Sequence, residues 1–348
     1  MDGLLPIVAA LTAFVVTALL GRVVIPYLHK LKYGQTILDI GPNWHKAKQG
    51  TPTMGGVMFI IGILVAAATA VIVALVEGTS GFAKEITSVS PQKRIYLVRV
   101  FAGLLMALSF AIVGFIDDYI KVVKKRNLGL TARQKTLFQL LIAAGYLTTL
   151  ILQGDTFTDI PFVGRIDCSS GIGLLYWPIA LFFIYGFVNA VNLTDGIDGL
   201  CSSVTAVVAA FFMLSSGVLK LYGLNVFAAI CLGGCAGFLI WNAHPAKVFM
   251  GDTGSLFLGG LVVAMAFASG MPIVLLLAGV VYLMEALSVV LQVAYYKRTK
   301  KRIFKMTPIH HHYEMSGWGE NKIVAVFSLI TIVGCLLAYL CFWGTYLR

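Results

Sequence analysis

Two adjacent aspartates, Asp117 and Asp118, stand at the end of a long apolar run and just before a group of lysines that begins with Lys121. The carboxyl end of a helix is unfavourable for carboxylates, so helix capping does not explain the pair. The pair could bind Mg²⁺, or one carboxylate could hold a proton or take one from a substrate. A solvated pair balanced by the following lysines explains the pattern equally well.

Polar side chains recur at every third residue in the segment 189–199, NAVNLTDGIDG. A helical turn continuing through this segment would place Asn189, Asn192, Asp195 and Asp198 along one face. Such a face beside two glycines suits a nucleotide or a sugar, because glycine allows close approach to the backbone. The alternative is a polar turn that ends one helix and caps the next. The periodicity favours a binding site.

Two further motifs open apolar runs. The segment 249–255, FMGDTGS, places Asp252 at the start of one run. Aspartate is a common helix cap, but helix N-termini also collect phosphates, and an aspartate there can hold Mg²⁺ that bridges to them. The segment 50–56, GTPTMGG, has ordinary helix-start residues, and Lys48 lies just before it. The first motif therefore has both a structural and a metal-binding interpretation.

Three consecutive histidines, His310, His311 and His312, lie inside the last basic loop rather than at a chain end. Three adjacent imidazoles do not ligate one metal comfortably, so hydrogen bonds or positive charge offered to a phosphate-rich ligand explain them better. Glu285 and Gln292 fall within the preceding apolar run. A carboxylate in such a run is a functional candidate, and the role of Glu285 stays open.

The elements that must position these residues are those of a membrane protein. Of the 348 residues, 59% are hydrophobic and 12% charged, against about 25% charged residues in soluble domains. This composition excludes a soluble protein and, despite the net charge of +11, nucleic-acid binding as the main role. The six cysteines lie mostly in apolar runs and form no zinc-like pairs, which excludes a disulfide-built secreted fold.

Long apolar runs predict about ten transmembrane helices, since about 20 apolar residues cross a bilayer. No soluble domain, repeat or low-complexity segment interrupts residues 1–348, so we expect a single all-α integral membrane domain. The predicted spans are 4–28, 54–76, 95–115, 136–152, 172–191, 200–219, 222–241, 253–269, 273–296 and 323–346.

Basic residues set the expected orientation. Ten spans put both termini on one side, and most of the 26 lysines and arginines fall in the loops of the other side. By the positive-inside rule those loops are cytoplasmic and both termini face outward. The acidic motifs fall on the same cytoplasmic side. Attraction to anionic lipid also accounts for the basic residues between Lys297 and Lys305.

Taken together, these motifs resemble the bacterial phospho-N-acetylmuramoyl-pentapeptide-transferases. The wider group is the polyprenyl-phosphate N-acetylhexosamine-1-phosphate transferases, of glycosyltransferase family 4. The resemblance covers nearly the whole chain. The segment GTPTMGG and the histidine triplet followed by Tyr313 and Glu314 are typical of the muramoyl-pentapeptide branch. The paired aspartates and the turn through Asp195 are shared with the wider group.

The resemblance implies transfer of phospho-N-acetylmuramoyl-pentapeptide from its UDP carrier to undecaprenyl phosphate. The products are lipid I and UMP, in the first membrane step of peptidoglycan synthesis. It further implies Mg²⁺ as cofactor, a multi-pass protein of the bacterial cell membrane with a cytoplasmic active site, contact with membrane lipids, and a homodimer. Several negative charges must be offset when a phosphate attacks a diphosphate, and the acidic and basic motifs fit that need.

The roles of single residues come from their positions in the family motifs. Asp252 resembles the principal Mg²⁺ ligand, with Asp117 and Asp118 as further metal-binding and catalytic candidates. Asp117 would act as general base on the lipid phosphate or orient it, and His311 is a further catalytic candidate. The residues implied to contact the nucleotide, phosphates, sugar or prenyl chain are Lys48, Lys121, Lys135, Asn189, Asn192, Asp195, Asp198, Asn242, Phe249, Gln292, His310 and His312.

Two other functions stay open. A transporter for an anionic solute also has many spans and buried polar groups. Its polar motifs typically lie in paired broken helices near the bilayer midplane, whereas here they gather at one face of spans that the sequence predicts to be unbroken. A nearer alternative is a sister transferase that uses UDP-N-acetylglucosamine. The sequence also leaves open whether the reaction passes through an aspartyl intermediate.

Overall fold

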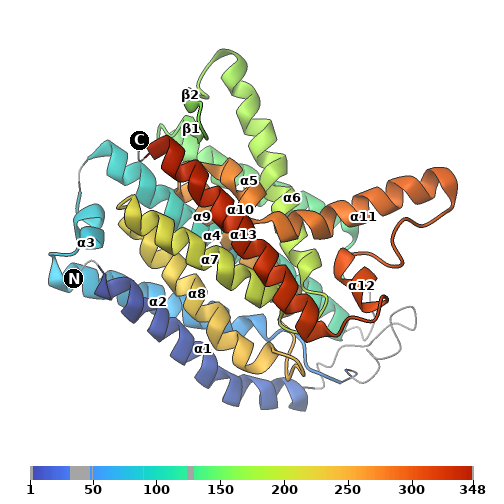
Figure 1. Cartoon of the computed structure of the whole chain (residues 1–348). Helices are drawn as coiled ribbons and strands as arrows, with labels where there is room; N and C mark the ends of the chain where they lie inside the picture. Colours follow the sequence, from blue (N-terminus) through green and yellow to red (C-terminus); the bar gives the residue numbers. More distant parts are fainter. Residues whose placement is uncertain (1–2, 32–47, 49, 89, 124–128, 347–348) are drawn as a thin grey trace.

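The computed structural model describes residues 3–31, 48, 50–88, 90–123 and 129–346. Within these ranges, ten helices are long and apolar enough to cross a membrane, which confirms the predicted number of spans. They pack as one bundle (Figure 1). The long helices are α1 Leu4–Lys30, α2 Gly56–Glu77, α4 Pro91–Val123, α5 Ala132–Leu152, α6 Tyr176–Thr194, α7 Leu200–Val218, α8 Tyr222–Asn242, α9 Gly251–Ala268, α11 Val280–Thr299 and α13 Glu320–Tyr346.

Short elements fill the connections between the long helices. An antiparallel hairpin formed by β1 (Phe157–Ile160) and β2 (Gly164–Asp167) follows α5. Arg99 holds its base by donating two hydrogen bonds of 2.6 Å to Asp155. The short elements are α3 Gly81–Ile86, β1 Phe157–Ile160, β2 Gly164–Asp167, the 3₁₀ helices Gly171–Leu175 and Pro272–Val274, α10 Leu275–Ala278 and α12 Ile309–Glu314.

The helix α9 is the centre of the bundle, because all its residues from Thr253 to Ala268 are buried. Glycines allow α4 to approach it closely. A Cβ at Gly260 would lie 2.6 Å from the Cα of Ala107, and one at Gly114 would overlap the carbonyl of Asp252. The second contact brings the end of α4 against the start of α9. The aspartates of the two helices are therefore close together.

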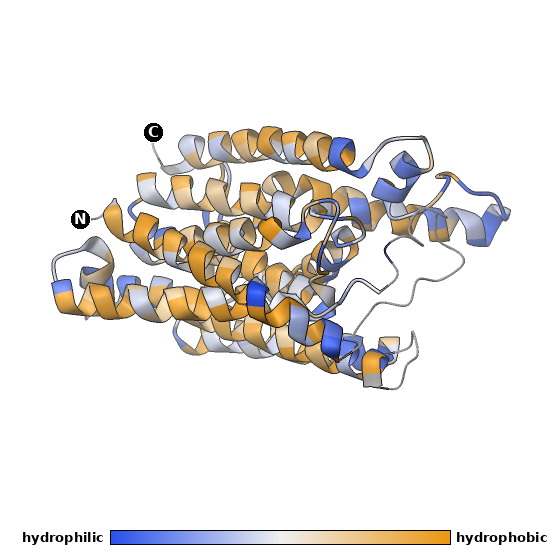
Figure 2. Ribbon diagram, turned by 90° about the horizontal axis from the view of Figure 1, so that it is seen from below, coloured by the Kyte–Doolittle hydropathy of each residue, from blue (hydrophilic) through white to orange (hydrophobic). Residues whose placement is uncertain are grey.

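The outer surface of the bundle is apolar. Leu105, Ile179 and Leu336 are each more than 60% exposed, and Figure 2 shows hydrophobic residues along most of each helix, with hydrophilic ones mainly toward the helix ends and connections. Exposed apolar area on this scale is unfavourable in water. Hydrocarbon chains cover it in a bilayer, so the surface agrees with a multi-pass membrane protein.

The described ends of the chain lie at the same end of the bundle, α1 beginning and α13 ending there (Figures 1 and 2). The chain alternates direction, so the opposite end collects the end of α4, the starts of α2, α5, α9 and α13, and the turns after α6 and α8. All the residues predicted to bind substrate or metal lie toward this opposite end. The assignment of that end to the cytoplasm stays a prediction.

Two predicted spans were wrong in detail. The third was expected to end at residue 115, but α4 continues to Val123. Lys121 pairs with Asp117 one helical turn away, at 2.6 Å, and such pairs support a helix beyond its apolar part. The ninth span was expected to be unbroken over 273–296. Gly279, with φ −99° and ψ 23°, separates α10 from α11, and α11 then projects away from the bundle (Figure 1).

Candidate active site

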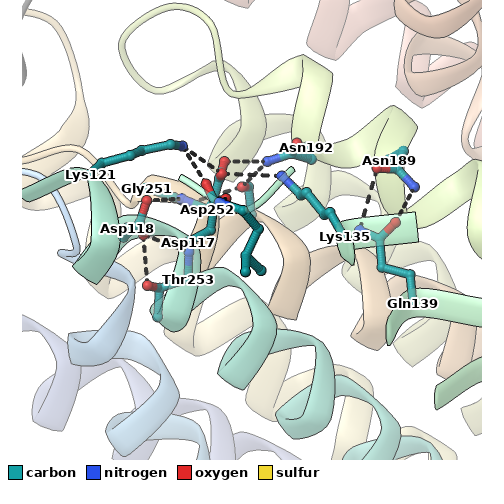
Figure 3. Close-up of polar contacts among 12 residues, drawn as sticks. Asp117, Asp118, Lys121, Lys135, Gln139, Asn189, Asn192, Gly251, Asp252 and Thr253 are labelled. Carbon is teal, nitrogen blue, oxygen red and sulfur yellow. Dashed lines mark hydrogen bonds and ion pairs between the residues drawn. The ribbon is translucent and has the colours of Figure 1, made fainter. Parts of the chain in front are cut away.

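Three carboxylates from two helices meet at the end of the bundle opposite the chain termini. Asp117 and Asp118 come from the last part of α4, and Asp252 is the second residue of α9. One oxygen from each lies within 4.8 Å of the others, and Figure 3 shows them pointing toward one another. The three aspartates that the sequence singled out are thus brought together, although 134 residues separate Asp118 from Asp252.

Asp118 forms the N-terminal cap of α9. Its two oxygens accept hydrogen bonds from the backbone N–H groups of Asp252, at 3.2 Å, and Thr253, at 2.9 Å. The hydroxyl of Thr253 donates a third, at 2.7 Å. A carboxylate satisfies free N–H groups at this position and interacts favourably with the helix dipole. Asp118 therefore fixes the place and direction of Asp252.

Asp252 receives hydrogen bonds from three other segments. The ammonium groups of Lys121 and Lys135 lie 2.8 and 3.1 Å from its Oδ2. The side-chain amide of Asn192 donates to its Oδ1 at 2.9 Å and to the hydroxyl of Ser255 at 2.7 Å. These contacts, drawn in Figure 3, join α4, α5, α6 and α9 at one carboxylate.

Asp117 is buried beside the start of the next segment. Its Oδ1 accepts a hydrogen bond of 2.7 Å from the backbone N–H of Leu130, and its Oδ2 lies 2.6 Å from the ammonium of Lys121. A Cβ at position 129 would overlap Asp117, so Gly129 lets the chain pass over the carboxylate. Lys121 is shared between Asp117 and Asp252, which makes the two carboxylates one electrostatic unit.

This group of carboxylates can hold a divalent cation. Carboxylate oxygens are the ligands that hard cations such as Mg²⁺ prefer. Among the residues that the structure describes, the three carboxylates pair with two lysines, Lys121 and Lys135. Asp118 uses both oxygens to cap α9. Asp252 and Asp117 therefore have the oxygens best placed to ligate a cation, once Lys121 and Lys135 move away from them.

The polar ladder after residue 189 does not form one face, because α6 ends at Thr194. Asn189 exchanges hydrogen bonds with Gln139 of α5, at 2.9 and 3.4 Å. Asn192 donates a hydrogen bond to Asp252, and Asp195 is the C-cap residue of α6. Asp198 points to a different group of residues. The prediction that these four residues share one helix face was therefore wrong. The middle two, Asn192 and Asp195, do lie beside the three aspartates.

Asp195 lies in an acidic environment. Burial, together with the charges of Asp252, Asp118 and Asp198, raises the pKa of its carboxyl group to about 8. A carboxyl group whose folded-state pKa is raised stabilises the fold below its unfolded pKa, near 4. That contribution is lost as the pH rises through the folded-state value.

We therefore expect Asp195→Asn to become more stable than the parent as the pH rises from 6 to 9. Asparagine resembles the protonated acid and cannot ionise. Thermal unfolding of both proteins in detergent, in metal-free buffer, measures the difference in melting temperature at each pH. A difference that stays constant over this range would contradict the raised pKa.

A second polar group, which we call the Lys48 cluster, contains Lys48, Asp198, His244 and Glu320. The ammonium of Lys48 lies 2.6 Å from Asp198 and 2.7 Å from Glu320. The Nδ1 of His244 lies 2.9 Å from the other oxygen of Asp198. Asp198, His244 and Glu320 also have the spacing of a metal site, but the ammonium already bonds to both carboxylates.

The histidine triplet lies on α12, and each ring has a different partner. The Nδ1 of His310 lies 3.0 Å from Glu285, and both side chains are fully buried. The Nδ1 of His311 lies 2.6 Å from Glu314, and His312 accepts a hydrogen bond from the backbone N–H of Lys305. His310 therefore supplies the partner for Glu285 that the sequence did not reveal.

His310 also lies beneath the turn that follows α6. A Cβ at Gly196 would overlap the Nε2 of His310, so this glycine is required by close packing. That Nε2 has no hydrogen-bond partner among the described residues, nor does Oε1 of Glu285. A buried imidazole here is poorly placed to contact phosphate directly, and that contact stays a prediction.

Three other predicted substrate-binding residues engage the backbone. Asn242 is buried and links two turns, accepting from the N–H of Gly199 at 3.2 Å and donating to the carbonyl of Val248 at 3.0 Å. Gln292 bonds to the backbone of residues 303 and 304. The N–H of Phe249 donates to Pro52, 2.9 Å away. Their predicted contacts with nucleotide or prenyl chain stay predictions.

Sequence reasoning missed several residues of these groups. Glu320 and His244 were not assigned a role, although Glu320 is an acid at the start of a span and His244 lies a few residues before Asp252. Gln139 and Thr253 were also missed. A polar residue in an apolar run was a usable signal for Gln139, and a threonine next to an aspartate at a helix start was one for Thr253.

Comparison with known proteins gives independent evidence on the family of this chain. Residues 100–270 match the model of glycosyl transferase family 4, and residues 48–60 match phospho-N-acetylmuramoyl-pentapeptide-transferase signature 1. The first range contains the three aspartates, and the second begins at Lys48.

Proteins named phospho-N-acetylmuramoyl-pentapeptide-transferase resemble the chain over nearly its full length. The one from Clostridium perfringens (strain SM101) is 45% identical over 335 residues, covering 96% of this chain and 95% of that protein. The one from Carboxydothermus hydrogenoformans is 44% identical over 347 residues, covering 95% and 97%. The one from Clostridioides difficile (strain 630) is 43% identical over 328 residues, covering 93% and 94%.

Proposed function

The chain belongs to the phospho-N-acetylmuramoyl-pentapeptide-transferase family, and from this premise we propose how its residues carry out the reaction. The protein transfers phospho-N-acetylmuramoyl-pentapeptide from UDP-N-acetylmuramoyl-pentapeptide to undecaprenyl phosphate, which gives lipid I and UMP. The observation that carries this function is the 45% identity over 96% of the chain. The carboxylates and lysines around Asp252 supply groups that phosphoryl transfer needs.

The main chemical difficulty is charge. A phosphate must attack a diphosphate, and two anions repel strongly at contact distance in a site of low dielectric. Lys121 and Lys135 converge on Asp252 from two helices, so their ammonium groups are placed to meet the phosphates that enter there. Asn192 and Asp118 hold Asp252 in place. The expected gain comes from orientation and charge neutralisation.

We propose Mg²⁺ as the cofactor, bound mainly by Asp252 with Asp117 in support. When bound, it would neutralise developing negative charge on the phosphate oxygens. Asp118 acts as the residue that positions Asp252. Asp117, buried and shared with Lys121, orients the lipid phosphate or takes its proton. His311, which is paired with Glu314, remains a further catalytic candidate.

We further propose that the end of the bundle bearing Asp252 faces the cytoplasm of a bacterial cell, in its cell (inner or plasma) membrane. The soluble UDP-linked donor is made available there, and the lipid phosphate lies at the headgroup level where the helix ends meet water. The excess of basic residues in the loops of this end supports the orientation. The homodimer that the family implies stays a prediction, to be tested by the mass of the protein in detergent.

The substrate is tested by offering purified protein both UDP-N-acetylmuramoyl-pentapeptide and UDP-N-acetylglucosamine with undecaprenyl phosphate. Mass spectrometry of the lipid product then identifies the transferred sugar. The expected result is lipid I with release of UMP. A lipid carrying only N-acetylglucosamine phosphate would favour the sister transferase. Uptake of labelled donor into sealed vesicles without lipid-linked product would favour a transporter.

Nucleotide recognition is proposed to depend on Asp195 and Asp198. Losing a hydrogen-bond partner of a buried polar group costs on the order of 1–3 kcal/mol, so UMP affinity should fall about tenfold or more in Asp195→Ala and Asp198→Ala. Calorimetric titration with UMP measures the effect. Asp167, exposed on β2 at the opposite end, gives the control variant Asp167→Ala. Unchanged UMP affinity in both test variants would remove the two residues from the pocket.

A further inference from the structure

Glu320, the first residue of α13, contacts two predicted site residues at once. Its carboxylate accepts a hydrogen bond of 2.7 Å from the ammonium of Lys48 and one of 2.9 Å from the backbone N–H of Asp198. The side chain is largely buried. Lys48 and Glu320 are separated by 272 residues, so the contact joins distant parts of the chain.

The rest of the Lys48 cluster leaves little freedom for its members. Asp198 bonds Lys48 through Oδ1, at 2.6 Å. Through Oδ2 it accepts from the backbone N–H of Ala246, at 3.0 Å, and contacts Nδ1 of His244, at 2.9 Å. The cluster therefore ties the segment before α2, the turn after α6, the turn after α8 and the start of α13 to one another.

The alternative role for this cluster is a second cation site. Asp198, His244 and Glu320 do present three ligand atoms within 4.8 Å of one another. The ammonium of Lys48, however, already bonds to both carboxylates and brings a positive charge to them. A lysine held by two carboxylates explains the geometry without a metal ion.

We infer that Glu320 is a positioning residue for the donor nucleotide and acts through Lys48. This inference rests on the proposed function, in which Asp198 recognises the nucleotide, and on the contact of Lys48 with the phosphates or sugar of the donor that the family resemblance implies. A lysine has a long, flexible side chain whose rotamer freedom opposes a fixed position. Two carboxylates hold it, and Glu320 also fixes the backbone of Asp198. Among the described residues, removing Glu320 leaves Lys48 with one carboxylate, Asp198, and removes the side chain that accepts from the N–H of Asp198.

The effect should fall on nucleotide binding rather than on the chemical step. Glu320 does not contact Asp117, Asp118 or Asp252 among the described side-chain hydrogen bonds. We therefore expect Glu320→Gln and Glu320→Ala to weaken UMP binding and raise the KM for the UDP-linked donor, both about tenfold, as for one hydrogen bond to a charged group. The kcat at saturating donor should change much less.

The experiment measures UMP affinity, KM, kcat and melting temperature for the full-length protein in detergent. The variants are Glu320→Gln, Glu320→Ala, Lys48→Met and the double variant Lys48→Met with Glu320→Gln. Because residues that act as a unit are not additive, Glu320→Gln should weaken UMP binding far less in the Lys48→Met background than in the parent. Glu77→Gln, at the opposite end of α2, is the matched control and should leave every value unchanged.

The outcomes separate this inference from the proposed function. Additive losses of UMP affinity in the double variant, or a lowered melting temperature with unchanged UMP affinity, would overturn the role of Glu320. If Glu320→Ala does not fold, the nearly isosteric Glu320→Gln decides. A parent protein that neither binds UMP nor forms lipid I would contradict the proposed function itself, because both are measured before any variant is compared.

Discussion

An Asp252→Asn variant is expected to lose about 10³-fold or more of its transfer activity while keeping its fold. Removing one electrostatic group aimed at developing charge commonly costs 10²–10³-fold, and Asp252 also orders its surroundings. Its carboxylate receives Lys121, Lys135 and Asn192. Asparagine keeps the shape but loses the charge that attracts both ammonium groups and a divalent cation. Lipid I formation, followed over a range of Mg²⁺ concentrations, measures the loss.

Two controls make this result specific. Asp167→Asn, on the exposed β2 strand, removes an aspartate charge at the far end of the bundle and should be neutral. The melting temperature of Asp252→Asn reports whether the fold is kept. We expect it to stay near that of the parent, because Asp118 caps α9 through backbone N–H groups that the substitution leaves intact. Near-normal activity of Asp252→Asn at low Mg²⁺ would refute its role as the principal ligand.

The sequence predicts the number of spans but not how they meet. Apolar runs of about 20 residues predict membrane helices reliably because the bilayer demands that length. Hydropathy does not indicate where a helix continues or breaks relative to its apolar run. The third span continues past its apolar part because Lys121 pairs with Asp117. The ninth breaks at Gly279, where a Cβ would lie 2.7 Å from the carbonyl of Leu275.

The candidate site was predictable as a set of residues but not as a set of contacts. Their places at the ends of apolar runs pointed to Asp117, Asp118 and Asp252. Only the close approach of α4 and α9 at Gly114 shows that Asp118 caps α9 and leaves the Asp252 carboxylate to the lysines. Local periodicity placed Asp198 with Asn189 and Asn192. It lies instead with Lys48 and Glu320, because the helix ends before it and long-range ion pairs decide its direction.

The same limit applies to the histidine triplet. The sequence suggested three imidazoles that offer hydrogen bonds or positive charge to a phosphate-rich ligand, because three adjacent histidines do not ligate one metal comfortably. On the short helix α12 each ring has a different partner, so His310 is buried against Glu285 while His312 accepts a hydrogen bond from the backbone of Lys305. A buried carboxylate in a membrane span needs a partner, but only the fold shows that the partner of Glu285 is His310.

An Asp117→Asn variant is expected to lower kcat by about 10²-fold or more, the cost of a reacting group that is no longer held in line. A lipid phosphate monoester has a second pKa of about 6, so it is largely dianionic at neutral pH and needs little deprotonation. Asp117, held by Lys121 and the N–H of Leu130, would then serve chiefly to orient the attacking phosphate. We therefore favour direct attack of undecaprenyl phosphate on the UDP-linked donor.

The alternative is a double displacement. An aspartate first attacks the β-phosphorus of the donor and releases UMP, and undecaprenyl phosphate then attacks the same phosphorus and displaces the aspartate. The stereochemistry at a chiral β-phosphorus of the donor decides between the two routes. One in-line displacement inverts the configuration at that phosphorus, and two restore it. We expect inversion. Net retention, or an acyl phosphate trapped on the protein in the absence of lipid, would exclude direct attack and make Asp117 or Asp252 the nucleophile. Residual activity in Asp117→Asn and Asp252→Asn would then identify the nucleophile, because the variant that lacks it could form no covalent intermediate.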